Sequence, residues 1–237
     1  MWHPTLGSMT SLSSFVSEHS EQNRNQGFFE LESEWLLEVN LRSAMVLMKI
    51  GSMVAYRGDI TFAREGILEQ GVGNVLKKVI SGEGAVFTKA TGTGKLYLAN
   101  RARLLTIIKL AGEALFMNGN DLLAVEPTLT RDIRMVRRLT GMLSGGLFNV
   151  KLEGTGAVVI ATHGKPMVLE VTPQSPVCTD PQATVGWSSG LEPELKTDIQ
   201  LKSLFGRGSG ESLQMRFEGK GFVIVQPYEE RLARVGA

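Results

Sequence analysis

Three stretches of the chain share one pattern of apolar and polar residues around a pair of glycines. They begin at Gly92, Gly154 and Gly219, read GTGKLYLA, GTGAVVIA and GKGFVIVQ, and follow one another at nearly equal intervals. Apolar and polar residues alternate strictly over residues 148–153 and 213–218, directly before the second and third copies, and less strictly before the first. Because alternation with a period of two is typical of a half-buried strand, the pattern predicts a strand before each glycine pair.

A second strand is predicted after each glycine pair. The residues that follow, 96–99, 158–161 and 222–226, are rich in β-forming side chains. A tight turn between two strands needs residues with positive φ, which glycine adopts without a steric penalty. The residue between the two glycines varies and is Thr93, Thr155 or Lys220. The sequence therefore predicts three β-hairpins with Gly-x-Gly as the turn, rather than three ligand-binding loops.

Further shared segments lie upstream of each predicted hairpin. Six apolar runs are interpreted as strands: residues 43–51, 53–60, 112–119, 122–129, 165–171 and 183–190. Between these runs and the hairpins, basic and aliphatic residues lead to a Ser-Gly pair, at residues 76–84, 137–146 and 201–211. The pattern leaves open whether these last segments are single helical turns or the ends of strands.

The pattern as a whole predicts an all-β fold with three internal pseudo-repeats in one domain. The domain is expected to span residues 27–230, with repeats at about 28–100, 101–161 and 162–230, followed by a C-terminal tail at 231–237. Residues 1–26 are rich in Ser, Asn, Gln and Glu and poor in aliphatic side chains, so a mobile N-terminal arm is expected there. This stretch lacks the basic and apolar regions of a secretory signal, which favours a cytoplasmic location.

One of the glycine pairs, in the segment ATGTGKLYLA at residues 90–99, invites comparison with phosphate-binding loops. Aligning Gly94 and Lys95 with a Walker A motif places Lys89 where the first glycine belongs and Leu96 where a hydroxyl belongs. The dinucleotide pattern G-x-G-x-x-G fails as well, because Tyr97 stands in place of the third glycine. The segment is therefore not interpreted as a nucleotide site.

Composition excludes several classes of protein. The formal net charge of the 237 residues is +1, which is not the electrostatic signature of a nucleic-acid-binding domain. No apolar run approaches the ~18 residues that a membrane-spanning helix requires. Cys178 is the single cysteine, so the chain has no internal disulfide and fits a reducing compartment.

Residues with catalytic or metal-binding potential are sparse. His163 is the one histidine outside the arm, which argues against zinc, and we expect it to be a turn residue. A triad of Ser144, His163 and Asp180 is conceivable, yet Met142 breaks the G-x-S-x-G elbow that would support it. The carboxylate pairs are interpreted as solvated surface: Glu192 with Glu194, and Glu229 with Glu230. We therefore expect no enzymatic activity, no catalytic, cofactor-binding or metal-binding residues, and no cofactor.

The segments at 76–99 and 142–161 resemble the signature of the altered-inheritance-of-mitochondria twenty-four family, whose bacterial members were long classed as a domain of unknown function. The resemblance extends from about Glu30 to Tyr228. It implies a β-sandwich or β-prism similar to the tryptophan-RNA-binding attenuation protein (a TRAP-like fold), with three pseudo-repeats in each chain of a homotrimer. Mitochondrial members are associated with inner-membrane organisation, and the bacterial members have no agreed activity.

These observations favour a non-enzymatic oligomeric scaffold or binding protein that acts through a multimeric β surface. Its expected partner is a further copy of itself, and another protein or a small ligand is left open. One alternative is binding of single-stranded RNA through Arg131, Arg134, Arg137 and Arg138, although only 7% of residues are aromatic and available for base stacking. The other is a membrane-associated organising factor. The close group Met45, Met48 and Met53 could provide an adaptable contact or belong to the core.

Overall fold

Antiparallel strands make up most of the protein. The computed structural model describes residues 10–22, 24, 27–64, 87–135, 148–197 and 213–227. Its elements are α1 (Leu12–Glu18), β1 (Phe29–Ser33), β2 (Leu36–Lys49), β3 (Met53–Arg64), β4 (Phe87–Leu98), β5 (Leu104–Asn118), β6 (Leu122–Val125), β7 (Thr130–Met135), β8 (Phe148–Thr162), β9 (Met167–Val171), β10 (Val177–Thr179), β11 (Thr184–Ser188), β12 (Glu194–Thr197), β13 (Leu213–Phe217) and β14 (Gly221–Val225). The predicted all-β class is confirmed.

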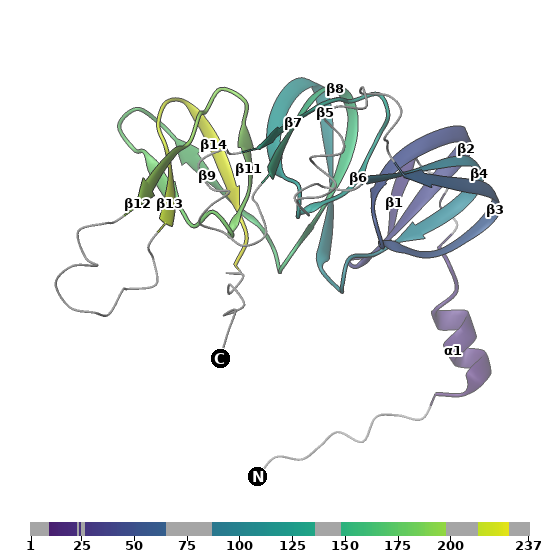
Figure 1. Cartoon of the computed structure of the whole chain (residues 1–237). Coiled ribbons are helices and arrows are strands. Elements are labelled where there is room, and N and C mark those ends of the chain that lie inside the picture. Colours follow the sequence, from purple (N-terminus) through teal and green to yellow (C-terminus); the bar gives the residue numbers. More distant parts are fainter. Residues whose placement is uncertain are drawn as a thin grey trace, which may run out of the picture.

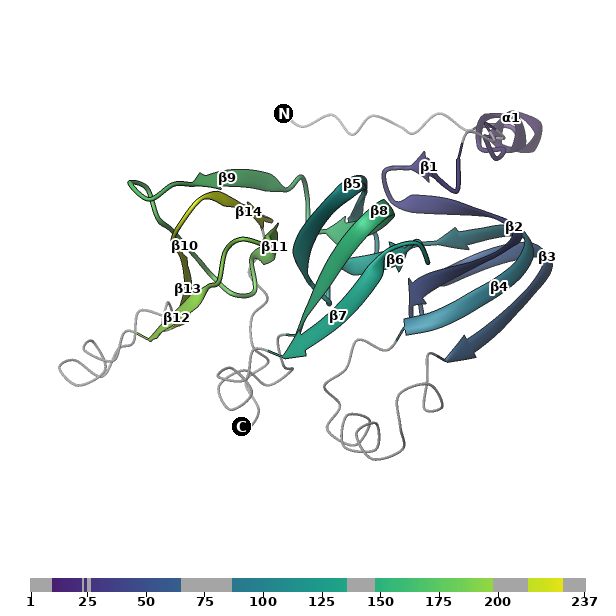
Figure 2. The ribbon, with the colours of Figure 1, turned by 90° about the horizontal axis from the view of Figure 1, so that it is seen from above.

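The strands gather in three groups that follow chain order, β1–β4, β5–β8 and β9–β14 (Figure 1). Most of them join one sheet with the order β3-β4-β2-β6-β8-β5-β11-β14-β9, to which β1 adds on β2 and β7 adds on β8. A smaller sheet has the order β10-β13-β12. Figure 2 shows that β3 and β10 lie at opposite ends of the molecule.

The apolar runs predicted from the sequence lie in strands. Residues 43–51 fall in β2, 53–60 in β3, 112–119 in β5, 122–129 in β6, 165–171 in β9 and 183–190 in β11, and the residues of a run that lie beyond its strand form turns or irregular segments next to it. The Ser-Gly segments at 76–84, 137–146 and 201–211 lie outside the described residues, so their conformation stays an open prediction. The expected N-terminal arm contains helix α1, which Ser11 caps and which buries none of its residues.

The prediction that each glycine pair forms a hairpin turn is wrong. Strand β4 runs without interruption through Gly92 and Gly94, and β8 does the same through Gly154 and Gly156. In the third copy, β13 and β14 flank the glycines but pair with other strands and not with each other. The alternating pattern therefore predicted the strands correctly, but the glycine pairs are not hairpin turns.

The glycines of β4 allow a close approach of the neighbouring strand. A Cβ atom on Gly94 would lie 2.0 Å from the carbonyl oxygen of Arg57 in β3, and one on Gly92 would lie 1.9 Å from the carbonyl oxygen of Asp59. The φ angle of Gly94 is 154°, a value that side chains disfavour. On the other side of β4, the register with β2 shifts between Leu41 and Ala44, directly opposite the glycines. The pair thus marks a bulged, tightly packed point in continuous strands.

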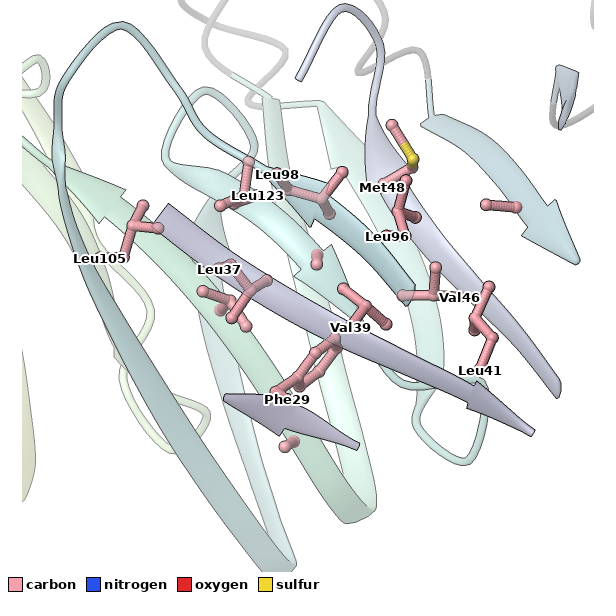
Figure 3. Close-up of a cluster of buried hydrophobic side chains, with 14 of the residues drawn as sticks. Phe29, Leu37, Val39, Leu41, Val46, Met48, Leu96, Leu98, Leu105 and Leu123 are labelled. Carbon is pink, nitrogen blue, oxygen red and sulfur yellow. The ribbon is translucent and has the colours of Figure 1, made fainter. Parts of the chain in front are cut away.

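Buried apolar side chains form a core in each group of strands. In the first, residues of β1, β2 and β4 pack together with Leu105 of β5 and Leu123 of β6, so elements of the second group complete it (Figure 3). The three methionines singled out from the sequence separate here. Met48 is buried in this core, Met45 packs against the second core, and Met53 is exposed.

Candidate functional site

A cluster of polar side chains, some buried and the others half-buried, lies where the ends of several strands meet. Lys49 ends β2, Arg103 precedes β5, Asp121 lies in the turn between β5 and β6, His163 follows β8, and Gln226 follows β14. We call these five residues the polar junction. They come from all three groups of strands and lie at strand ends or in the short segments next to them.

Arg103 and Asp121 form the centre of the polar junction. The Nη1 atom of Arg103 lies 3.0 Å from Oδ1 of Asp121, and its Nε donates a hydrogen bond of 2.8 Å to Nε2 of His163. Because a guanidinium can only donate, Nε2 of His163 accepts, and the ring proton of the neutral imidazole resides on Nδ1. Arg103 also donates to the carbonyl oxygens of Asn120 and Ala161, so it links three segments.

The remaining members close the network. The side-chain amide of Gln226 donates to both carboxylate oxygens of Asp121 at 3.4 Å, and its oxygen accepts the backbone N–H of His163 at 2.9 Å. Lys49 donates to the carbonyl oxygen of Asn120 at 2.6 Å. The polar groups of the junction therefore engage one another and the backbone, an arrangement typical of a structural network that fixes strand ends.

Burial changes the acidity of Asp121, whose residue surface is 1% exposed. Burial raises the pKa of Asp121 to about 6, although the charge of Arg103, the amide of Gln226 and the charge of Lys49 each act to lower it. The carboxylate is consequently ionised at neutral pH and takes up a proton in mild acid. This proton uptake links the stability of the junction to pH.

Asp121→Asn is expected to remove one pH-dependent component of stability. The folded-state pKa of about 6 exceeds the ordinary 3.8, so the folded protein binds this proton more tightly than the unfolded chain. The contribution of Asp121 to stability is therefore full below about pH 4 and falls by about 2–3 kcal/mol as the pH rises to about 6. Urea unfolding of the wild type and the variant at pH 4 and pH 7 measures the effect. A difference between the two proteins that is the same at both pH values would contradict the prediction.

The structure describes two of the three residues considered for a catalytic triad, His163 and Asp180. His163 occupies a bend, as predicted, but its side chain belongs to the polar junction, while Asp180 accepts the backbone N–H of Gln182. Ser144 lies outside the described residues. Glu192 and Glu194 are exposed, and Glu229 and Glu230 also lie outside the described part. Over the residues that the structure describes, no three His, Cys, Asp or Glu side chains are grouped to hold a metal ion.

The basic residues considered for RNA binding are only partly described. Arg131 and Arg134 lie in β7, which pairs with β8 at the edge of the second group. Arg137 and Arg138 fall outside the described residues. The described helix is too short and too polar to cross a membrane.

Exposed apolar side chains gather at the two ends of the strand system. On β3, Met53, Val54 and Tyr56 are exposed, and the Tyr56 ring contacts that of Phe62 with centroids 5.4 Å apart. We call the segment Met53–Arg57 the β3 edge, since β3 pairs with β4 alone among the described strands. Arg57, at its end, pairs with Glu21 of the N-terminal arm at 2.8 Å.

The opposite end is formed by β9 and β10. Met167 and Val168 of β9 are exposed, as is the free thiol of Cys178 in β10. Among the described strands, β10 pairs with β13 alone. Exposed apolar groups that gather on edge strands are typical of protein interaction surfaces. The molecule therefore has one such surface at each end.

Fold and surface together define a class: an antiparallel all-β protein whose long strands have a bulged, tightly packed point at paired glycines. A family model described as Mitochondrial biogenesis AIM24 matches residues 29–228. The chain belongs to this family, and the resemblance seen in the sequence is confirmed.

A crystal structure of a protein from Streptococcus pyogenes has a similar fold. The two chains share 21% sequence identity with a TM-score of 0.65, and the similarity covers 85% of this chain and 92% of the other. No curated protein matches the chain.

Proposed function

We propose that the protein is a non-enzymatic scaffold or binding protein that works as a homo-oligomer, presenting its β surface in several copies. The observation that carries the proposal is the β3 edge, where consecutive residues of a long strand are exposed although several are apolar. A monomer would leave this surface in water at a cost of roughly 25 cal/mol for each Å² of apolar area. Assembly of copies covers it.

The polar junction, a cluster of polar and ionisable groups around the buried Asp121, supports the non-enzymatic part of the proposal because its groups engage one another. Its members come from three groups of strands and are held by protein partners. The proposal includes a cytoplasmic location, which the exposed free thiol of Cys178 favours because such thiols persist in reducing compartments.

The proposal also includes three pseudo-repeats, each with a central glycine-containing strand between two partners. In the first, β4 lies between β2 and β3; in the second, β8 lies between β5 and the pair β6 and β7. In the third, β14 lies between β9 and β11, and β13 lies between β10 and β12. In each repeat, the pairing of one partner strand with the central strand has a register shift at the matching place. The partner strands are β3, β6 and β11, and the shifts lie between Met53 and Ala55, between Leu122 and Ala124, and between Thr184 and Gly186.

Light scattering coupled to size exclusion tests the oligomer. We expect a mass three times the chain mass of 25.8 kDa, because the family resemblance implies a homotrimer. The mass should persist at high salt, since the exposed edges are largely apolar and salt screens charge interactions only. A mass equal to one chain at micromolar concentration would refute the proposed mode of action, and a mass of two chains would refute the trimer.

The two alternatives remain predictions with simple tests. Binding of single-stranded RNA through the arginine group would appear in filter binding and would weaken steeply as salt is raised. A membrane-associated role would appear as co-sedimentation with liposomes.

A further inference from the structure

Two junctions between neighbouring groups of strands are built in the same way. Strand β6 of the second group pairs with β2 of the first, with Leu47 opposite Val125 and Met48 opposite Ala124. Strand β11 of the third group pairs with β5 of the second, with Phe116 opposite Trp187. In both junctions a strand of the later group pairs antiparallel with the long strand of the earlier group that also pairs with its central strand.

The central strands show that the two junctions use equivalent residues. Leu47 and Phe116 lie opposite Lys89 and Lys151 of the central strands, each five positions before the second glycine of its pair. In the third group, the residue five positions before the second glycine is Arg216 of β13. Cys178 of β10 lies opposite Arg216.

The strands that the later groups contribute to the two junctions, β6 and β11, also use equivalent residues. Val125 and Trp187 lie opposite Val158 and Val223 of the central strands, each two positions after the second glycine. In the first group this position is held by Tyr56 of β3, opposite Leu96. A third junction would therefore join Tyr56 of β3 to Cys178 of β10, but β3 and β10 lie at opposite ends of one chain (Figure 2).

Burial shows that the β3 edge lacks a neighbour that its counterparts have. Val125 is 0% exposed and Trp187 is 3% exposed, whereas Tyr56 at the equivalent position is 48% exposed. The residues two positions earlier in the same strands show the same contrast. Leu123 and Val185 are both 0% exposed, whereas Val54 is 59% exposed. On the other half, Leu47 is buried and Cys178 is exposed.

We propose that the third junction forms between two copies of this chain, with β3 of one copy pairing antiparallel to β10 of the next. The register places Tyr56 opposite Cys178, Ala55 opposite Thr179 and Arg57 opposite Val177, as the two internal junctions dictate. The contact is heterologous, since each copy offers β3 on one side and β10 on the other, and in the proposed trimer it closes into a ring. This inference rests on the proposed homo-oligomer and specifies its interface.

The single native cysteine makes this register directly testable. Tyr56→Cys gives a chain with two thiols, which the proposed register places opposite each other on different copies. Directly opposed residues of antiparallel strands have Cα atoms about 4.5–5.5 Å apart, within the range of a disulfide. Mild oxidation with diamide, which takes up the two protons and two electrons of the thiols, should link chains in sequence up to the complete ring on a non-reducing gel.

Two controls accompany the cross-link. Tyr56→Ser removes the ring without adding a thiol, and Trp35→Cys adds a thiol at an exposed aromatic position in the turn between β1 and β2, away from the contact. Neither should give linked species beyond the wild-type background. Absence of linkage in the Tyr56→Cys protein while light scattering reports an oligomer would overturn this interface and leave the proposed function standing. A monomeric wild type would overturn both.

A charge placed in the contact gives a second measurement. Val54→Asp should reduce the oligomer to single chains at micromolar concentration, because the carboxylate would be buried at the junction without a partner. The fold of each chain should persist, since Val54 is exposed within one chain. Val16→Asp, on exposed helix α1, is the matched control and should leave the mass unchanged. An oligomer of unaltered mass in the Val54→Asp protein would contradict the proposed contact.

Discussion

Gly94→Ala is expected to lower the free energy of unfolding by about 3–5 kcal/mol, because it combines backbone strain with overpacking. The added methyl group would lie 2.0 Å from the carbonyl oxygen of Arg57 and 3.1 Å from the Cα of Gly58. Both obstacles are backbone atoms of β3, so no side-chain rotation relieves them. Strand β3 must shift away from β4, and their shared ladder extends from Met53 to Arg64. Urea unfolding followed by circular dichroism, at one protein concentration, measures the loss.

Two other glycines separate the sources of this loss. Gly112 has a φ of 104° but open space around the position of a Cβ, so Gly112→Ala reports backbone strain alone and should cost about 1–2 kcal/mol. Gly190 has open space and no positive φ, so Gly190→Ala should change stability by less than about 0.5 kcal/mol. If Gly94→Ala cost no more than Gly112→Ala, the close approach of β3 and β4 would not be a packing constraint.

The strands could be predicted from sequence because their signal is local. Alternation over residues 148–153 identified the first half of β8, and the apolar runs located β2, β3 and β5. The glycine pairs misled the prediction because a tight turn and a close interstrand approach require the same property, the absence of a Cβ. What distinguishes the two is a neighbour remote in sequence. Gly58 of β3 lies opposite Gly94, and the residues next to Gly94 in the sequence do not indicate this pairing.

The polar junction could not be predicted because its members are ordinary residues of separate turns. Arg103, Asp121 and Gln226 belong to no sequence motif that points to a site. His163 was considered as a turn residue and as a member of a triad, and neither interpretation indicates its contact with Arg103. Their association depends on how the groups of strands pack, which places the ends of β5, β8 and β14 together.

The β3 edge shows a different limit of the sequence. The run at residues 53–60 was identified as a strand of the same kind as 122–129 and 183–190, and its apolar content does not reveal that it is exposed. Exposure depends on whether a neighbouring strand is present. Two of the three equivalent strands have that neighbour within the chain, and the contrast among them is visible in the structure alone.

The polar junction gives the second large expected effect. Arg103→Met is expected to lower the free energy of unfolding at pH 7 by about 3–5 kcal/mol, because it leaves the Asp121 carboxylate ionised and buried without its cation. The side chains of Arg103 and Asp121 are 11% and 2% exposed, so water compensates little. Lys151→Met, which removes an ion pair with Glu153 at an exposed site, is the matched control and should cost less than about 1 kcal/mol.

The pH dependence of this loss distinguishes an uncompensated charge from lost packing. The charge of Arg103 lowers the pKa of Asp121, so removing it raises that pKa above its present value of about 6. At pH 5 the carboxyl group of the variant is therefore protonated when folded, and the buried charge that makes the substitution costly at pH 7 is absent. Urea unfolding of both proteins should show a clearly smaller loss at pH 5 than at pH 7. An equal loss at the two pH values would mean that Arg103 stabilises the protein through its packing and its bonds to backbone carbonyls, and that its charge on Asp121 contributes little.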